Sequence, residues 1–67
     1  MAIEEYQKRV MAERQELSER LQDLYAFLGS EKARLVTMKQ FNLMHRQASV
    51  MAQYHEILCE RMADDFD

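Results

Sequence analysis

The chain has 67 residues, a formal net charge of −3 and a single cysteine, Cys59. A core of this size is marginal when it stands alone, so we expect one small domain that associates with a further chain. One cysteine excludes an internal disulfide, no signal peptide is recognisable, and no apolar run approaches the roughly 20 residues of a membrane-spanning helix. The negative charge argues against DNA binding, which needs a basic face.

The first half of the chain predicts one long helix. It contains no proline, and its apolar residues recur at helical spacing, at Ile3, Val10, Leu17, Leu21, Leu24 and Leu28. We predict a helix over about residues 2–28. Gly29 follows directly, and we expect it to close this helix in the left-handed conformation that glycine adopts without strain.

The second half predicts a turn and another helix. Residues 29–36 are compatible with a loop or with a single helical turn that begins at Ser30. Thr37 and Gln40 have the spacing of a capping box, in which each side chain bonds a free backbone N–H at the start of a helix. We predict this helix over about residues 38–64.

Two helices of similar length with a short connection predict an all-α, antiparallel two-helix hairpin. The second helix carries two adjacent apolar rows, one of Met44, Met51 and Leu58 and the other of Leu43, Val50 and Ile57. This apolar face is wider than one neighbouring helix can cover. We therefore expect the hairpin to assemble into a dimeric four-helix bundle or a larger helical homo-oligomer.

A row of mostly polar residues accompanies the apolar row in each helix. The rows are Tyr6, Glu13, Arg20 and Phe27 in the first helix and Gln47, Tyr54 and Arg61 in the second. We expect both rows to face inward, with Tyr6 level with Arg61, Glu13 with Tyr54, and Arg20 with Gln47. Such pairs either fix the register of the helices or line a pocket in which tyrosine stacks and arginine binds phosphate or carboxylate.

Other polar groups give weaker signals. His55 and Cys59 are four residues apart on one helix face, but two ligands do not make a metal site, and no phosphate loop or nucleophile motif is present. We therefore expect a protein that is not an enzyme and holds no cofactor or metal. Residues 29–46 form a basic tip, with Lys32, Arg34, Lys39 and Arg46 against Glu31.

Two segments, "RVMAERQELSERLQDLYAFL" and "LMHRQASVMAQYHEILCERM", resemble a family of short helical-hairpin accessory proteins of tailed bacteriophages, including crAss-like phages. The resemblance covers nearly the whole chain and is carried by Arg9, Val10, Glu13, Glu16, Leu17, Arg20, Leu24, Phe27, Leu43, Gln47, Met51, Tyr54, Leu58 and Arg61. Arg20 replaces the usual lysine and Met62 the usual isoleucine. The resemblance implies a phage accessory protein in the cytoplasm of the infected bacterial host.

Two functions are considered as hypotheses. In the first, a phage oligomer sequesters a nucleotide-derived immune signal, a cyclic nucleotide or an ADP-ribose derivative, between its helices without turning it over. The expected contacts are Tyr54, Arg61, Arg20, Gln47, Tyr6 and Arg9. In the alternative, the protein is an inhibitor or adaptor that binds a host protein through its apolar face or its basic tip, and the polar rows are structural.

Overall fold

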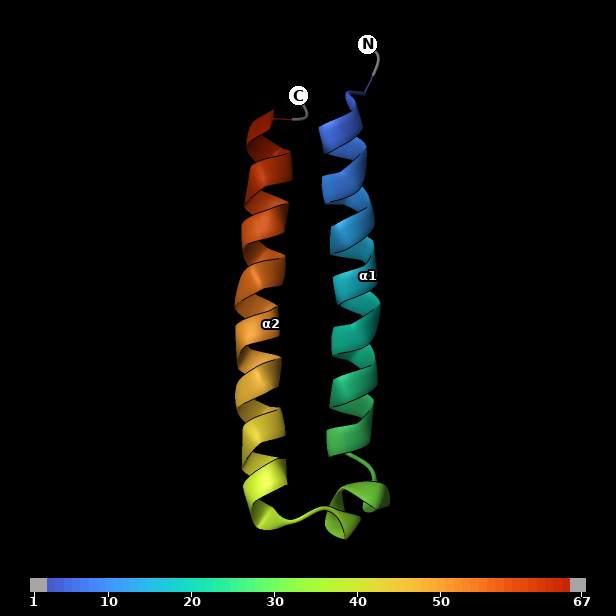
Figure 1. Ribbon diagram of the computed structural model, residues 1–67, viewed down its shortest axis with the longest axis vertical. Coiled ribbons are helices and arrows are strands. Elements are labelled where there is room, and N and C mark those ends of the chain that lie inside the picture. Colours follow the sequence, from blue (N-terminus) through green and yellow to red (C-terminus); the bar gives the residue numbers. More distant parts are fainter. Residues whose placement is uncertain (1–2, 66–67) are drawn as a thin grey trace.

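The computed structural model describes residues 3–65 as two long helices with a short 3-10 helix between them. These elements are α1 (Glu5–Leu28), η1 (Glu31–Leu35) and α2 (Met38–Asp65). The helices run antiparallel, so the first turn of α1 and the last turn of α2 meet at one end, the open end, while η1 forms the tip (Figure 1). The hairpin is 49 Å long and about 15 Å across. The predicted all-α hairpin and its two helices are confirmed.

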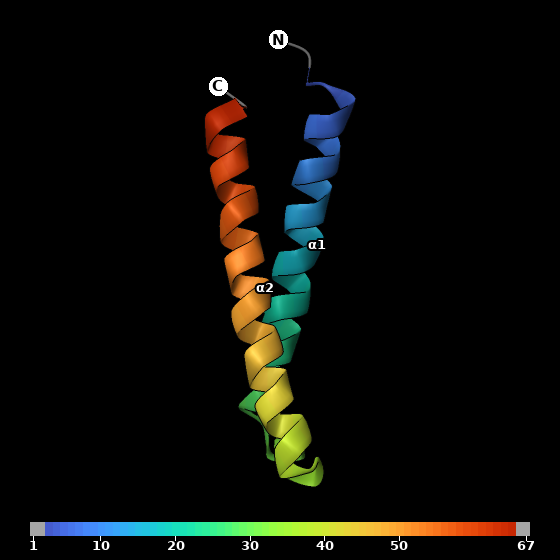
Figure 2. The same cartoon turned by 60° about the vertical axis from the view of Figure 1, so that its left-hand side comes forward.

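The helices meet along a seam with alternating spacings of three and four residues. The buried and half-buried seam residues of α1 are Gln7, Val10, Arg14, Leu17, Leu21, Leu24 and Leu28, and those of α2 are Phe41, Met44, Ala48, Met51, His55, Leu58 and Met62. This 3-4 pattern is that of two helices packed nearly along each other. A turned view shows that α1 and α2 are inclined to each other and overlap near the tip in this projection (Figure 2).

The core of the hairpin is small. Within residues 3–65, the buried apolar side chains are Val10, Ala33, Ala48 and Leu58, and only Leu58 among the large ones is fully buried. The other leucines and methionines of the seam keep part of their surface exposed. Two helices can cover only one stripe of each other, so the second apolar row of α2, Leu43, Val50 and Ile57, remains exposed.

The helix ends confirm some predictions and correct one. The Gln40 backbone N–H donates to the Thr37 hydroxyl oxygen at 3.1 Å, as expected for the threonine half of a capping box. Gly29 was expected in the left-handed region, and this prediction is wrong, because its φ is −89° and its ψ 0°. The Ser30 hydroxyl donates to the Phe27 carbonyl at 2.7 Å and leads directly into η1. The chain thus turns by a tight right-handed helical segment, which needs no glycine.

Neither long helix has an apolar stretch sufficient to span a lipid bilayer, within the part of the chain that the structure describes.

Candidate functional site

The polar rows predicted to face inward lie at the exposed edge of the seam. Glu13, Arg20, Gln47, Tyr54 and Arg61 are all exposed. The expected inward orientation is therefore wrong for the single chain. The reason is that the second seam row of α1 is the neighbouring row of Gln7, Arg14, Leu21 and Leu28, because its two leucines turn the contact stripe toward themselves.

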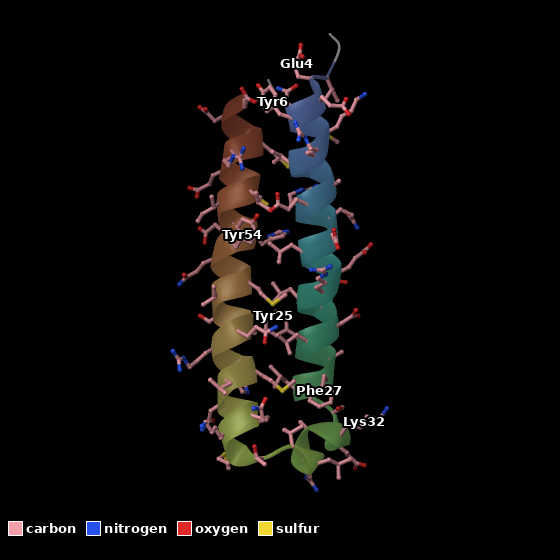
Figure 3. The ribbon with its side chains drawn as sticks, in the orientation of Figure 1. Glu4, Tyr6, Tyr25, Phe27, Lys32 and Tyr54 are labelled. Carbon is pink, nitrogen blue, oxygen red and sulfur yellow. The ribbon has the colours of Figure 1, made fainter. Side chains whose placement is uncertain are left out.

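Two of the expected pairs nevertheless share a hollow, although the register differs from the predicted one by five residues, because Gln7 lies level with Asp65 and not with Glu60. Tyr54, midway along α2, shares a hollow of about 120 Å³ with Glu13, and Tyr6, at the open end, shares another of about 260 Å³ with Arg61 (Figure 3). Both rows therefore lie on one face of the hairpin. We call it the ladder face, defined by Tyr6, Glu13, Arg20, Phe27, Gln47, Tyr54 and Arg61.

The middle hollow combines an aromatic ring with both signs of charge. Its lining residues are Glu13, Glu16, Leu17, Arg20 and Tyr54. The Arg20 guanidinium donates to the Glu16 carboxylate at 2.5 Å, and both side chains remain largely exposed. A surface ion pair of this kind adds little to stability. The ion pair instead fixes the position of the Arg20 guanidinium, which lines the same hollow as the Tyr54 ring.

The hollow at the open end also combines an aromatic ring with both signs of charge. Tyr6, Val10, Arg61, Asp64 and Asp65 line it. The hydrogen bond with the Asp65 carboxylate raises the pKa of the Tyr6 hydroxyl above 10.0, and the negative charge of Asp65 acts in the same direction. Arg61 is the cation beside two carboxylates here, just as Arg20 is in the middle hollow.

Two expected contacts are not brought to these hollows. Gln47 lines a separate hollow of about 370 Å³ with Leu43, Arg46, Val50 and Met51. Its amide lies 3.8 Å from the Met51 sulfur. Arg9 is exposed on α1 and is not among the residues of the middle or open-end hollows. The predicted register had suggested hydrogen bonds from Glu13 to Tyr54 and from Arg20 to Gln47. Between residues 3 and 65, neither hydrogen bond is present.

The tip carries a larger, more apolar hollow of about 450 Å³. Its lining residues are Leu28, Ser30, Ala33, Arg34, Val36, Met38 and Phe41. Of the four cations of the predicted basic tip, Arg34 lines this hollow, and Lys32 projects from η1 on the outside (Figure 3). The sequence indicated the charge here but not the hollow, which arises because η1 packs against α1 before the chain crosses to the start of α2.

One buried polar group was missed in the sequence. The Nε atom of Arg14 is buried in the seam without a hydrogen-bond partner. Gln7 and Asp65 are hydrogen-bonded, so Arg14, seven residues further along α1, lies level with Leu58, seven residues earlier in α2. The spacing of seven residues between Gln7, Arg14 and Leu21 could have placed Arg14 in the seam. The prediction instead placed the adjacent row, which contains Glu13, in the seam.

His55 and Cys59, the pair considered in the sequence as metal ligands, lie close together. The Cys59 sulfur lies 3.8 Å from Nδ1 of His55 within α2. Among the described residues, no third histidine, cysteine or carboxylate joins them in a group that could hold a metal ion. The ladder face instead offers a stacking surface, guanidinium donors and carboxylate acceptors, which are groups suited to binding a polar small molecule.

Comparison with known proteins gives one match. The model of the Sequestin family matches residues 4–64, which include α1, the tip, α2 up to its last residue and the whole ladder face. No curated protein and no solved structure matches the chain. The family's name denotes sequestration, which is a binding activity and not a catalytic one. Since the match covers nearly the entire hairpin, the chain belongs to the Sequestin family.

Proposed function

We propose that this protein is a phage-encoded anti-defence protein that sequesters a nucleotide-derived immune signal. The observation that carries the proposal is the Sequestin match over residues 4–64. The signal is a cyclic nucleotide or an ADP-ribose derivative, held between helices and released unchanged. Because no turnover takes place, the free signal falls only by binding, which requires nanomolar affinity and expression at the concentration of the signal.

The middle hollow supports this proposal through three complementary groups. The exposed Tyr54 ring offers a face on which a base stacks, an interaction worth about 1–3 kcal/mol. Arg20 offers a fork that matches phosphate oxygens, provided that the phosphate displaces the Glu16 carboxylate. Glu13 beside them accepts hydrogen bonds, and ribose hydroxyls are suitable donors.

The remaining expected contacts have secondary roles in this proposal. Arg61 and Tyr6 share the open-end hollow, and Gln47 lies toward the tip, so these three flank the Tyr54 hollow along the ladder face. Arg9 adds positive charge on the exposed side of α1. Such a distribution suits a ligand that is extended along the seam.

Thermal stabilisation by a panel of nucleotides tests the proposal. We expect at least one among cyclic AMP, cyclic GMP, cyclic di-AMP and ADP-ribose to raise the melting temperature, because a ligand that binds only the folded state stabilises it. Tyr54→Ala should lose the shift. Tyr25→Ala is the matched control, because the exposures of the two tyrosines are similar, 51% for Tyr25 and 42% for Tyr54. They differ in that only Tyr54 is one of the residues that define the ladder face. No shift with any signal-type nucleotide would reject sequestration of this class.

A second candidate function is inhibition of a host protein, or an adaptor role, through the tip. The observation that favours it is the apolar hollow at η1, beside which Leu35 is 85% exposed and Met38 73% exposed. Exposed apolar side chains that cluster into one patch commonly mark a surface that contacts another protein. Capture of one host protein that is lost on combined Lys32→Glu and Arg34→Glu substitution would favour this function.

A further inference from the structure

A second heptad pattern follows the outside of α2. Its positions alternate at spacings of four and three residues and are all exposed: Leu43, Gln47, Val50, Tyr54, Ile57 and Arg61. We call them the outer stripe. It extends for about 27 Å along α2, at a rise of about 1.5 Å per residue. The seam has the same period, so α2 has the pattern of a helix with two helical neighbours.

The surface area of the chain supports a missing neighbour. The hairpin exposes 5495 Å². A folded monomer of its mass, 8.0 kDa, exposes about 4,450 Å² by the usual scaling of area with mass. The excess of about 1,000 Å² per chain is comparable to the area that each partner buries in a stable protein interface, about 800 Å². Val50, in the middle of the stripe, is 64% exposed.

We propose that the outer stripe packs against the outer stripe of a second copy, antiparallel about a two-fold axis, and that the ligand site is completed only in this dimer. The second part rests on the function proposed above. An axis level with residue 52, the midpoint of the stripe, places Val50 level with Tyr54 of the second copy. Leu43 then lies level with Arg61 of the second copy, and Gln47 with Ile57.

Charge decides the antiparallel direction. The tip residues 29–46 contain four cations and one carboxylate, whereas residues 47–67 contain five carboxylates and one cation. The antiparallel arrangement puts the basic tip of each copy beside the acidic open end of the other, and Lys39 level with Asp65 of the second copy. A parallel arrangement would instead place like charges together, including Arg61 against Arg61, which disfavours association.

The dimer also supplies what the single-chain hollow lacks. The hollow beside Tyr54 measures about 120 Å³, whereas ligand pockets measure about 300–1,000 Å³. The two Tyr54 residues are offset by four residues across the axis, about 6 Å along the helices. From the Gln7–Asp65 bond, Arg20 lies level with Ala52, so both Arg20 residues lie at the level of the axis. One ligand on the axis would reach both Arg20 guanidiniums in place of their Glu16 carboxylates, which predicts one ligand per two chains.

The mass in solution tests the interface. Light scattering should give the mass of two chains for the native protein, and the mass of one chain for Val50→Glu. Ser49→Glu is the matched control, because Ser49 is also exposed on α2, is adjacent in sequence, and lies outside the outer stripe. A native protein with the mass of one chain, or a Val50→Glu variant that keeps the mass of two, would overturn the interface.

Cross-linking tests the direction without relying on a destabilised variant. In a Cys59→Ser background, Leu43→Cys and Arg61→Cys chains are mixed and oxidised. The antiparallel register predicts that disulfides join Leu43→Cys to Arg61→Cys chains, since those positions lie level across the axis. A predominance of disulfides between identical chains would show a parallel pair and overturn the register.

Titration with ADP-ribose and cyclic di-AMP separates the shared site from the proposed function. We expect half a ligand per chain, and at least about a 5-fold loss of affinity in Val50→Glu, the lower limit of a lost stacking contact. Tight binding of one ligand per chain by Val50→Glu would refute the shared site and leave sequestration intact. A native dimer that binds neither these ligands nor the rest of the panel would refute sequestration, and with it the shared site, while the interface stands.

Discussion

Gln7 ties the two free ends of the hairpin together through both atoms of its side-chain amide. Its Nε2 donates to the Asp65 backbone carbonyl at 3.0 Å and to the Asp65 carboxylate at 3.3 Å, and its Oε1 accepts from the Glu4 backbone N–H at 2.9 Å. One residue thus satisfies a free N–H at the start of α1 and a free carbonyl at the end of α2. It also sets the register on which the positions of Arg14 and Arg20 depend.

Gln7→Ala should lower the free energy of unfolding by about 1 kcal/mol, because it removes a helix cap and an interhelical hydrogen bond at an exposed site. Chemical denaturation monitored by circular dichroism measures the change. Gln15→Ala is the control, since Gln15 bonds only to Glu19 within α1. Equal losses in the two variants would contradict a bridging role for Gln7.

Tyr6 gives the open end a dependence on alkaline pH. Its pKa is raised in the folded chain by the hydrogen bond with Asp65, so the contribution of this bond is fully present below pH 10.0 and is lost as the pH rises through the higher folded-state pKa. The melting temperature of the native protein should therefore exceed that of Tyr6→Phe near neutral pH, and the difference should shrink above 10.0. A difference that grows with pH would contradict this assignment.

Thr37 caps α2, and its hydroxyl is the group that matters. Thr37→Val should destabilise the hairpin by about 1 kcal/mol, because the Gln40 N–H loses its acceptor, whereas Thr37→Ser should be nearly neutral. Thermal unfolding of the two variants in parallel checks the prediction. Equal stability of Thr37→Val and Thr37→Ser would show that the hydroxyl contributes nothing.

The helices and their ends were predictable because they depend on local chemistry. Apolar spacing located α1 and α2 to within a few residues, and Thr37 marked the start of α2. The prediction for Gly29 was wrong, since glycine after a helix usually signals a left-handed closure, whereas here the chain continues into η1. The conformation of a turn depends on the next element of the chain, and the short segment 30–36 carries no strong signal of its own.

Gly29→Ala therefore provides a direct check on the turn. With φ at −89° and an added Cβ at 3.5 Å from the Tyr25 carbonyl oxygen, alanine fits without strain. The variant should be more stable by about 0.4–1 kcal/mol, because it reduces the conformational freedom of the unfolded chain. Loss of more than about 1 kcal/mol in chemical denaturation would indicate the left-handed closure instead.

Arg14 holds a buried Nε atom without a partner, which costs stability. Arg14→Met keeps most of the side-chain length in the seam and removes the unpaired donor, so we expect the free energy of unfolding to rise by about 1 kcal/mol. Arg14→Ala is the comparison, and it should destabilise by leaving a void beside Leu58. A destabilised Arg14→Met would show that the guanidinium has a partner that supports the fold.

Two residue pairs of the candidate site were predictable, but the register and the orientation of the helices were not. Periodicity placed Glu13 with Tyr54 and Tyr6 with Arg61, and the structure groups both pairs. It did not distinguish the row of Glu13 from the row of Arg14, which are adjacent on the helix and differ by about 100°. Which row is buried depends on the packing of Leu21 and Leu28 against α2, a tertiary property that a single helix does not encode.

Recovery of the ligand from the protein tests the central claim, sequestration without chemistry, most directly. Protein purified from bacteria that produce the immune signal is heated, and the released small molecules are identified by mass spectrometry beside an equal amount of Tyr54→Ala. We predict that the native protein releases an intact nucleotide that Tyr54→Ala retains poorly. Release of a cleaved or modified nucleotide would contradict sequestration in favour of catalysis, and equal release from both proteins would contradict the site at Tyr54.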